Sequence, residues 1–513
     1  MAFEEQITEL ERRRAKARAM GSAKRLAAWA EAGILNARQR IDYLADPGTF
    51  TEWGLLAVSE RAEDRHRTPG DGVVDGYAQI GGRPVVIHAA EFSAMGASSA
   101  AIASKKRQHS IENANKNGIP VVALNECSGA RMPDIMGAQG IHAAAEKGAL
   151  RRHRKVPWAS AVLGQSFGGG TWLSVMSDFI VMRKGAIMAV SSTNVTSVAI
   201  AEDEDPEDLG GWRMQTEVSG QVDMAVDSDE EALDAIRRFL SYLPSNSAEA
   251  PPRLAVPAGS GADYEKLGEK ILDLVPESRA KVYDVRKVIR LIVDQDSYFP
   301  IKERFSKVVS TCLARIDGRS VGIIATNPMF KGGAMDGDAC DKIIGFLVLC
   351  DSFNIPVIHL VDTPGFLVGV VGERQKLPGK IMNYIQAMAM TTVPLLTVIM
   401  RKSYGQAHLN IGAVHADEMC SWYTGDISFV DPKISVSVVH KLKREDDPER
   451  YAELEQRFER GTSPYDLAEP FMIQDVIDPR ETRSWLSRML DLHDRRMVKG
   501  VGEHLMATWP TTF

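Results

Sequence analysis

An internal repeat constrains the fold more than any other feature of this 513-residue sequence. Three segments recur in the same order: residues 80–85 as residues 316–321, residues 118–122 as residues 354–358, and residues 166–170 as residues 403–407. The first two pairs share an offset of 236 residues, and the third slips by one residue. Solenoid repeats recur every ~20–50 residues, far below this spacing. The repeat therefore predicts a duplicated domain.

Within each copy, short apolar runs alternate with longer helical patterns. Residues 85–87 and 121–124 are strand-like, and residues 98–117 between them have a helical pattern. Such alternation predicts an α/β protein built from ββα or βαβ units. The segment 245–261 is rich in Ser, Ala, Pro and Gly, as linkers are. We therefore expect four parts in sequence: a helical arm at 1–44, a first domain at 45–247, a linker at 248–261 and a second domain at 262–513.

The composition excludes several classes of protein. Lys and Arg number 61 against 68 Asp and Glu, a net charge of −7, which provides no field for nucleic acid or an anionic membrane. The five cysteines form no CxxC pair, so we expect neither a disulfide framework nor a metal site. This cysteine usage favours a protein of the reducing cytoplasm. The first residues lack the apolar core of a signal peptide. The uncharged run 156–177 is interrupted by glycines, so we expect no membrane span.

The third repeated segment carries the first candidate site. In each copy a short apolar strand runs into a glycine turn and then into a possible helix start. Glycine lets the main chain approach a ligand closely, and the first turn of a helix has unpaired N–H groups. Together they make an oxyanion hole, in which one lost donor typically costs about 3 kcal/mol of the barrier. We expect one at the turn that begins at Gly168 and another at the turn that begins at Gly405; the alternative is turns that serve only tight packing.

A second candidate segment closes the strand 121–124. It consists of Ser128, Gly129, Ala130 and Arg131, whose turn amides and guanidinium could hold a phosphate or nucleotide. The alternative is an arginine that fixes its own loop. The common phosphate and hydrolase motifs GxxxxGK[ST], GxGxxG, GxSxG and HExxH do not occur in a suitable context.

Several of these segments also carry a family resemblance. They are residues 37–42 (ARQRID), 70–74 (GDGVV), 128–131 (SGAR), 208–211 (DLGG), 229–232 (DEEA), 362–366 (DTPGF) and 401–405 (RKSYG). As a set they resemble the carboxyltransferase (β) subunits of biotin-dependent acyl-CoA carboxylases, of the propionyl-CoA and methylcrotonyl-CoA carboxylase type. The resemblance covers essentially the whole chain. It implies two tandem crotonase-like domains.

The resemblance also implies an activity and its partners. The enzyme would move CO2 from carboxybiotin to the α-carbon of an acyl-CoA. Gly168 and Gly169 would hold the thioester oxygen and stabilise the enolate, while Gln406 and Ala407 would receive the biotin ureido oxygen. Each site would lie between subunits of a hexamer. Residues 387–390 (AMAM) lack the lysine of a biotin attachment motif, so biotin would come on a separate carrier protein with a separate biotin carboxylase.

The second half departs from the family pattern around its glycine turn. Gln406 stands where the family has glycine, Leu409 where it has Asp or Ile, and residues 431–434 (DPKI) replace a glycine-containing turn. His408 is new and could be a general acid or base beside the hole, or simply structural. Two alternatives therefore stay open. One is a biotin-independent acyl-CoA decarboxylase or C–C hydrolase that uses Gln406 and His408; the other is a non-catalytic pseudo-subunit.

Overall fold

The chain forms two units, which the sequence repeat predicts. The computed structural model describes residues 3–143, 152–256, 260–413, 415–494, 497 and 500–510. Contacts divide it into Met1–Ala248 and Glu249–Phe513. Residues 257–259 of the expected linker lie outside the described residues. Each unit contains one eight-stranded sheet.

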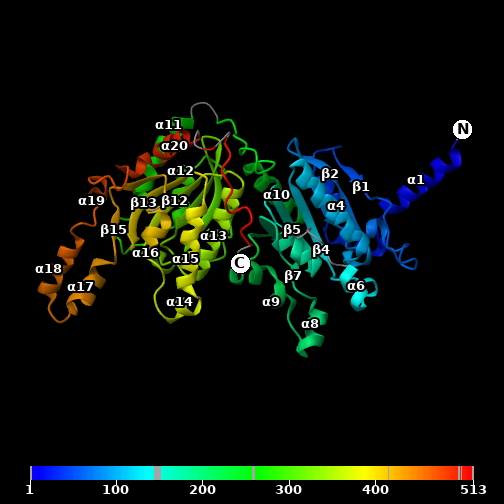
Figure 1. Cartoon of the computed structure of the whole chain (residues 1–513), viewed down its shortest axis with the longest axis horizontal. Helices are drawn as coiled ribbons and strands as arrows, with labels where there is room; N and C mark the ends of the chain where they lie inside the picture. The colour runs from blue at the N-terminus through cyan, green and yellow to red at the C-terminus, as the bar shows by residue number, and fades with distance from the viewer. Residues whose placement is uncertain are drawn as a thin grey trace. The chain divides into compact units, whose positions relative to one another are not determined.

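The first unit begins with the helical arm that the sequence predicts. Its helices are α1 (Glu4–Arg18), α2 (Ala23–Glu31), α3 (Ala37–Leu44), α4 (Ala101–Asn117), α5 (Met132–Ile135), α6 (Gly137–Ala143), α7 (Gly169–Val175), α8 (Thr193–Ile200), α9 (Pro206–Gly210) and α10 (Asp229–Tyr242). Its strands are β1 (Thr51–Trp53), β2 (Val73–Ile80), β3 (Arg83–Ala90), β4 (Val121–Cys127), β5 (Trp158–Phe167), β6 (Phe179–Arg183), β7 (Ile187–Ala189) and β8 (Met224–Val226). In Figure 1, α4 lies along the sheet and α1 extends away from it.

The second unit repeats the strands of the first and adds helices at both ends. Its strands are β9 (Phe299–Ile301), β10 (Val309–Ile316), β11 (Arg319–Thr326), β12 (Val357–Thr363), β13 (Leu395–Tyr404), β14 (Glu418–Trp422), β15 (Asp426–Ser428) and β16 (Asp475–Ile477). Its helices are α11 (Ser260–Leu274), α12 (Val285–Ile292), α13 (Gly337–Ser352), α14 (Val370–Arg374), α15 (Leu377–Met390), α16 (Gly405–His408), α17 (Pro432–His440), α18 (Pro448–Glu459), α19 (Tyr465–Ala468) and α20 (Thr482–His493). Helices α13 and α15 pack together (Figure 1).

The two sheets have the same topology, strand for strand. The first runs β1-β2-β3-β4-β5-β6-β8 with β7 on β5, and the second runs β9-β10-β11-β12-β13-β14-β16 with β15 on β13. Each begins with antiparallel strands and continues with parallel ones. The repeated segments occupy equivalent places, because Ile80 pairs with Arg83 in one hairpin and Ile316 with Arg319 in the other. The carbonyls of Pro120 and Pro356 likewise accept equivalent hydrogen bonds, at 2.9 and 2.8 Å. The duplication is confirmed.

The central parallel strands form the core of each unit. All seven residues of β4 and all seven of β12 are buried, as expected for parallel strands covered on both faces. A buried lysine anchors the long helix beside each sheet: Lys106 donates to the carbonyls of Gly70 and Val73, and Lys342 to those of Phe305 and Val309. Burial lowers the pKa of Lys342 to about 7.

The arm is buried in the first unit at α3, whereas α1 lies on its surface. None of the residues of α1 is buried, whereas α3 buries Arg40 among its four buried residues. The guanidinium of Arg40 pairs with Glu126 at 2.5 Å and with Asp229 at 2.9 Å. Two of the family-like segments therefore meet at a buried ion pair with a structural role. Among the described residues, none of the helices has the length and apolar character that crossing a membrane requires.

Candidate functional site

Three loops of the first unit meet at one edge of its sheet. They follow β3, β4 and β5, whose carboxyl ends share an edge because these strands are parallel. In open α/β sheets, ligands bind at this edge. Ser99 joins the loops: its N–H donates to the carbonyl of Gly129 at 2.9 Å, and a Cβ on Gly169 would lie 2.7 Å from its hydroxyl oxygen. The structure thus brings the two segments singled out in the first half, residues 128–131 and the glycine turn, close together.

The two glycines of the first turn have different roles. Gly168 has φ +56°, a left-handed conformation that glycine adopts without strain, and its N–H donates to the carbonyl of Val190 at 3.2 Å. Gly169 is the first residue of α7, where N–H groups have no partner within the helix. Of the two glycines, Gly169 therefore has the amide that the turn can offer to a ligand, and Gly168 supplies the bend.

Sequence reasoning missed a strained turn beside this one. Met95, Gly96 and Ala97 follow one another with φ of +49°, +66° and +47°. Consecutive left-handed residues store strain of a kind that clusters at functional sites. The second unit repeats the turn at Lys331, Gly332 and Gly333, with φ of +49°, +62° and +90°. The signal in the sequence was weak, because only the run of small residues 96–100 (GASSA) marks it.

The segment 128–131 is held by its own arginine. Arg131 is buried, and its guanidinium donates to Asp71 Oδ1 at 2.7 Å, to the hydroxyl of Ser98 at 3.1 Å and to the carbonyl of Ser98 at 3.3 Å. All three guanidinium nitrogens are thus used within the fold. Arg131 fixes its own loop, which is the alternative weighed for it above. Ser128 and Ala130 are exposed, and Gly129 has φ +101°.

Cationic side chains gather instead around two adjoining cavities near the strained turn. The cavities measure about 380 and 330 Å³ and share Met20, His66 and Pro69. The first reaches Met95 and is lined by Arg25 and Arg67. The basic residues around the second are Arg12, Arg13, Lys16 and Arg65. No carboxylate is among the lining residues that the structure describes, but Glu9 pairs with Arg12 and Arg13 at 2.7 Å.

The second glycine turn has the same bend and different side chains. Gly405 has φ +58°, and a Cβ there would lie 2.9 Å from the carbonyl oxygen of Phe429. Gln406 has right-handed backbone, so it carries no strain, and its exposed carboxamide donates to Asn410 Oδ1 at 2.8 Å. Ala407 is buried, and Leu409 is 41% exposed.

His408 is attached to the end of the strand that precedes the turn. Its Nδ1 lies 2.9 Å from the hydroxyl oxygen of Ser403, and the side chain is half-buried. Burial lowers the pKa of His408. Near neutral pH the imidazole is therefore uncharged. The nearby replacement at residues 431–434 forms a helix cap, in which Asp431 accepts the N–H of Lys433 at 2.9 Å as α17 begins.

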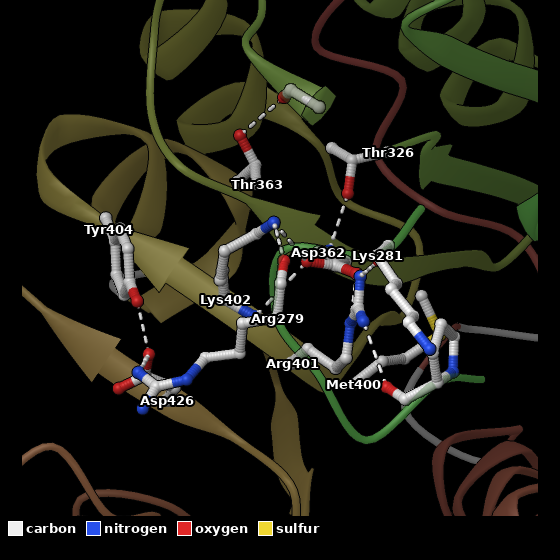
Figure 2. Close-up of polar contacts among 12 residues, drawn as sticks. Arg279, Lys281, Thr326, Asp362, Thr363, Met400, Arg401, Lys402, Tyr404 and Asp426 are labelled. Carbon is white, nitrogen blue, oxygen red and sulfur yellow. Dashed lines mark hydrogen bonds and ion pairs between the residues drawn. The ribbon is translucent and has the colours of Figure 1, made fainter. Parts of the chain in front are cut away.

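Charged residues beneath the second turn fix the strand that carries it (Figure 2). Arg401 pairs with Asp362 at 2.7 Å and donates to the carbonyls of Pro276, Ser278 and Lys281 at 3.0–3.1 Å. The hydroxyl of Tyr404 donates to Asp426, which also pairs with Arg279. These contacts hold the residues next to Gly405. Within the described residues, no cluster of His, Cys, Asp or Glu has a metal-binding arrangement.

Comparison with known proteins extends over nearly the whole chain. A family model described as "Carboxyl transferase domain" matches residues 30–502. The propionyl-CoA carboxylase carboxyltransferase subunit of Haloferax mediterranei is 34% identical over 97% of both chains. The methylmalonyl-CoA decarboxylase subunit alpha of Propionigenium modestum is 31% identical over 98% of this chain and 97% of that one. A crystal structure of transcarboxylase 12S, a hexamer with methylmalonyl-CoA and methylmalonic acid bound, matches with TM-score 0.88 and 30% identity over 96% and 97% of the chains.

Proposed function

Because the chain belongs to the carboxyl transferase family and has its tandem crotonase-like domains, we propose that it transfers a carboxyl group between biotin and the α-carbon of an acyl-CoA. Acyl-CoA carboxyl transfer is the activity of the family, and biotin on a separate carrier is the part that we add. The observation that carries the proposal is the pair of glycine turns. Gly168 and Gly405 occupy equivalent places, with φ of +56° and +58°, and each precedes an amide that has no partner among the residues that the structure describes.

We assign the acyl-CoA to the first domain, residues 45–247. The amide of Gly169 would donate to the thioester oxygen, where negative charge builds up when the α-carbon becomes an enolate. The hydroxyl oxygen of Ser99 leaves no room for a Cβ at position 169, so glycine is required there. The backbone of Ser128, Gly129 and Ala130 forms the adjacent wall of the site.

The two cationic cavities fit the other end of the same substrate. Coenzyme A carries a diphosphate and a 3′-phosphate, and arginine binds phosphate through paired N–H groups. Arg25 and Arg67 lie by the cavity that reaches Met95, the first residue of the strained turn. We place the phosphates here rather than on Arg131, because Arg131 is buried with all three guanidinium nitrogens bonded. Among the described residues, Arg25 donates through Nη1 alone, to the carbonyl of Phe92 at 2.9 Å, and the exposed Arg67 lies 3.8 Å from Asp64.

The second domain, residues 262–513, would receive biotin. The donor set of its turn fits a ureido oxygen, because the N–H groups of Gln406 and Ala407 lie in the first turn of α16. Leu409 is exposed and apolar, which suits a ligand ring. Biotin, when bound, supplies a carboxyl group carried on a ureido nitrogen. The residues of this chain would orient that group and exclude water from it.

The partners that this function requires are a biotin carboxylase and a biotin carrier protein. We further propose a homohexamer, in which each site forms between the first domain of one subunit and the second domain of another. The hexamer of transcarboxylase 12S supports this assembly. The α1 helix, which buries no residue within its own chain, offers a surface for it. The two most informative relatives are named for adding and for removing a carboxyl group, so the direction of transfer would follow the partners.

The test is carboxyl transfer with purified partners. The protein is mixed with a biotin carboxylase, a biotinylated carrier, ATP and labelled bicarbonate, and a panel of short and branched acyl-CoAs is offered. We expect label in one or more acyl-CoA products and loss of that label when avidin is added. A carboxylated carrier that passes no label to any acyl-CoA would contradict the proposal. Decarboxylation by the protein alone, unaffected by avidin, would instead favour the biotin-independent enzyme.

A further inference from the structure

Two equivalent buried serines have different surroundings in the two units. Ser166 and Ser403 each stand two residues before the left-handed glycine of their turn. Ser166 is fully buried, and its hydroxyl has no hydrogen-bond partner among the described residues. Ser403 is 1% exposed, and its hydroxyl lies 2.9 Å from Nδ1 of His408. In the first unit the position of His408 is occupied by Thr171, which bonds backbone carbonyls instead.

The burial of Ser403 decides where the proton of the imidazole lies. A buried hydroxyl without an acceptor is costly, and Nδ1 is the acceptor that this hydroxyl has among the described residues. For that acceptor to be used, the Ser403 hydroxyl must donate to Nδ1. A neutral imidazole that accepts at Nδ1 carries its hydrogen on Nε2. Ser403 thus selects the Nε2–H form of His408.

The other ring nitrogen is available to a ligand. Nε2 of His408 has no hydrogen-bond partner among the described residues. It is also not among the buried polar atoms that lack a partner, so it is accessible from outside the protein. His359, by contrast, has both of its nitrogens enclosed and unpaired. Burial is the cause that lowers the pKa of His408. The imidazole therefore remains neutral near pH 7 and keeps its Nε2–H.

We propose that His408 is a neutral hydrogen-bond donor to an oxygen of the ligand in the second half-site, and that Ser403 is the positioning residue that keeps the proton on Nε2. This inference rests on the proposed function, because that function places the ligand at the Gly405 turn. The oxygen is that of a carbonyl or a carboxylate. The same geometry argues against a general base, since in the Nε2–H form the basic lone pair lies on Nδ1, which faces the Ser403 hydroxyl rather than the ligand.

Substitutions of His408 distinguish a role as hydrogen-bond donor from a role as general base. Glutamine can offer an N–H near the place of Nε2 but cannot act as a base, and alanine can do neither. We expect His408→Gln to keep carboxyl transfer within about tenfold of wild type, and His408→Ala to lose about a hundredfold, as for an oxyanion-hole donor. Equal losses in the two variants would overturn the donor role. An acid limb in the pH profile of wild type that is absent from His408→Gln would overturn it as well.

The tautomer is measured without any ligand or partner. Protein labelled with ¹⁵N-histidine is examined by solid-state NMR, and the signal missing from His408→Gln is assigned to His408. We expect the Nε2–H form in wild type and a changed ratio of tautomers in Ser403→Ala. Ser166→Ala, which removes the equivalent serine of the other unit, is the matched control and should leave the signal unchanged. An Nδ1–H form in wild type, or no change in Ser403→Ala, would overturn the role of Ser403.

The two experiments fail in distinguishable ways. If wild type transfers no carboxyl group and His408 is nevertheless in the Nε2–H form, the proposed function is wrong and the assignment of Ser403 stands. If transfer is normal and the tautomer is Nδ1–H, the proposed function stands and the inference about His408 is wrong.

Discussion

The two glycine turns have the same backbone conformation at the bend, but the side chains that follow the bend differ. In the first unit the bend at Gly168 is followed by Gly169 and Gly170, so the ligand would meet main chain alone. In the second the bend at Gly405 is followed by Gln406, whose carboxamide is tied to Asn410. One left-handed glycine is thus sufficient to form the bend. The positions after it are free to carry side chains, and only the second unit uses that freedom.

The largest expected effect comes from filling the space beside the first turn. Gly169→Val places a branched side chain where a Cβ would already lie 2.7 Å from the Ser99 hydroxyl oxygen, so the amide must move. We expect turnover to fall at least about a hundredfold, the scale of one lost oxyanion donor. Steady-state transfer rates measure it. Gly379→Val is the control, because a Cβ at Gly379 meets nothing within 4 Å. Full activity of Gly169→Val would remove the first turn from the chemistry.

The second unit is expected to be the more acid-sensitive because of one histidine. His359 in β12 stands where β4 has Ala123, and complete burial lowers its pKa to about 3. Between pH 6.5 and 3 the unfolded chain binds a proton there and the folded chain does not. Stability is therefore lost as the pH falls through this window, by about 2 kcal/mol at pH 5.

The variant His359→Leu should remove that part of the acid sensitivity. Denaturant unfolding at pH 5 and pH 8 is compared between the variant and wild type, and the difference should be smaller in the variant. His440→Leu, which removes an exposed histidine of α17, is the control and should behave as wild type. Parallel pH dependence in His359→Leu and wild type would refute the assignment.

A third comparison distinguishes the phosphate end of the proposed acyl-CoA site from its thioester end at the glycine turn. Arg67→Ala removes a cation from the cavity wall without touching the glycine turn. We expect the KM for acyl-CoA to rise about tenfold at unchanged kcat, because one charge-assisted phosphate contact is lost. The effect should shrink with a dephospho-CoA thioester if Arg67 faces the 3′-phosphate. Arg450→Ala, an exposed arginine of α18, is the control. An unchanged KM in Arg67→Ala would place the phosphates elsewhere.

The smallest effect is expected from making the second turn like the first. Gln406 has right-handed backbone, so Gln406→Gly relieves no strain and removes only the side chain and its bond to Asn410. For a carboxyltransferase we expect activity to persist or to rise, measured as label transferred from the carrier. Loss of most activity would show that the carboxamide takes part in the reaction, as the biotin-independent alternative requires.

Local signals determined the repeated architecture and the bends. Apolar strands, a Pro that precedes each central strand and a glycine after β5 and β13 are local features, and they recur 236 or 237 residues apart. Physical rules of strand and turn formation act over a few residues, which is why these elements could be predicted. The helical arm was predicted on the same grounds.

Only the tertiary structure decided which of the candidate residues face a ligand. The guanidinium of Arg131 donates to Asp71, which lies 60 residues earlier in the chain. The amide of Gly168 donates to the carbonyl of Val190, which lies 22 residues later. The cationic cavities combine α1 and α2 with residues 65–67, and the tautomer proposed for His408 rests on the burial of Ser403. A donor can serve a ligand only if contacts within the fold leave at least one of its N–H or O–H groups accessible and unbonded. Pairing is settled by contacts between distant segments, and the sequence alone does not display them.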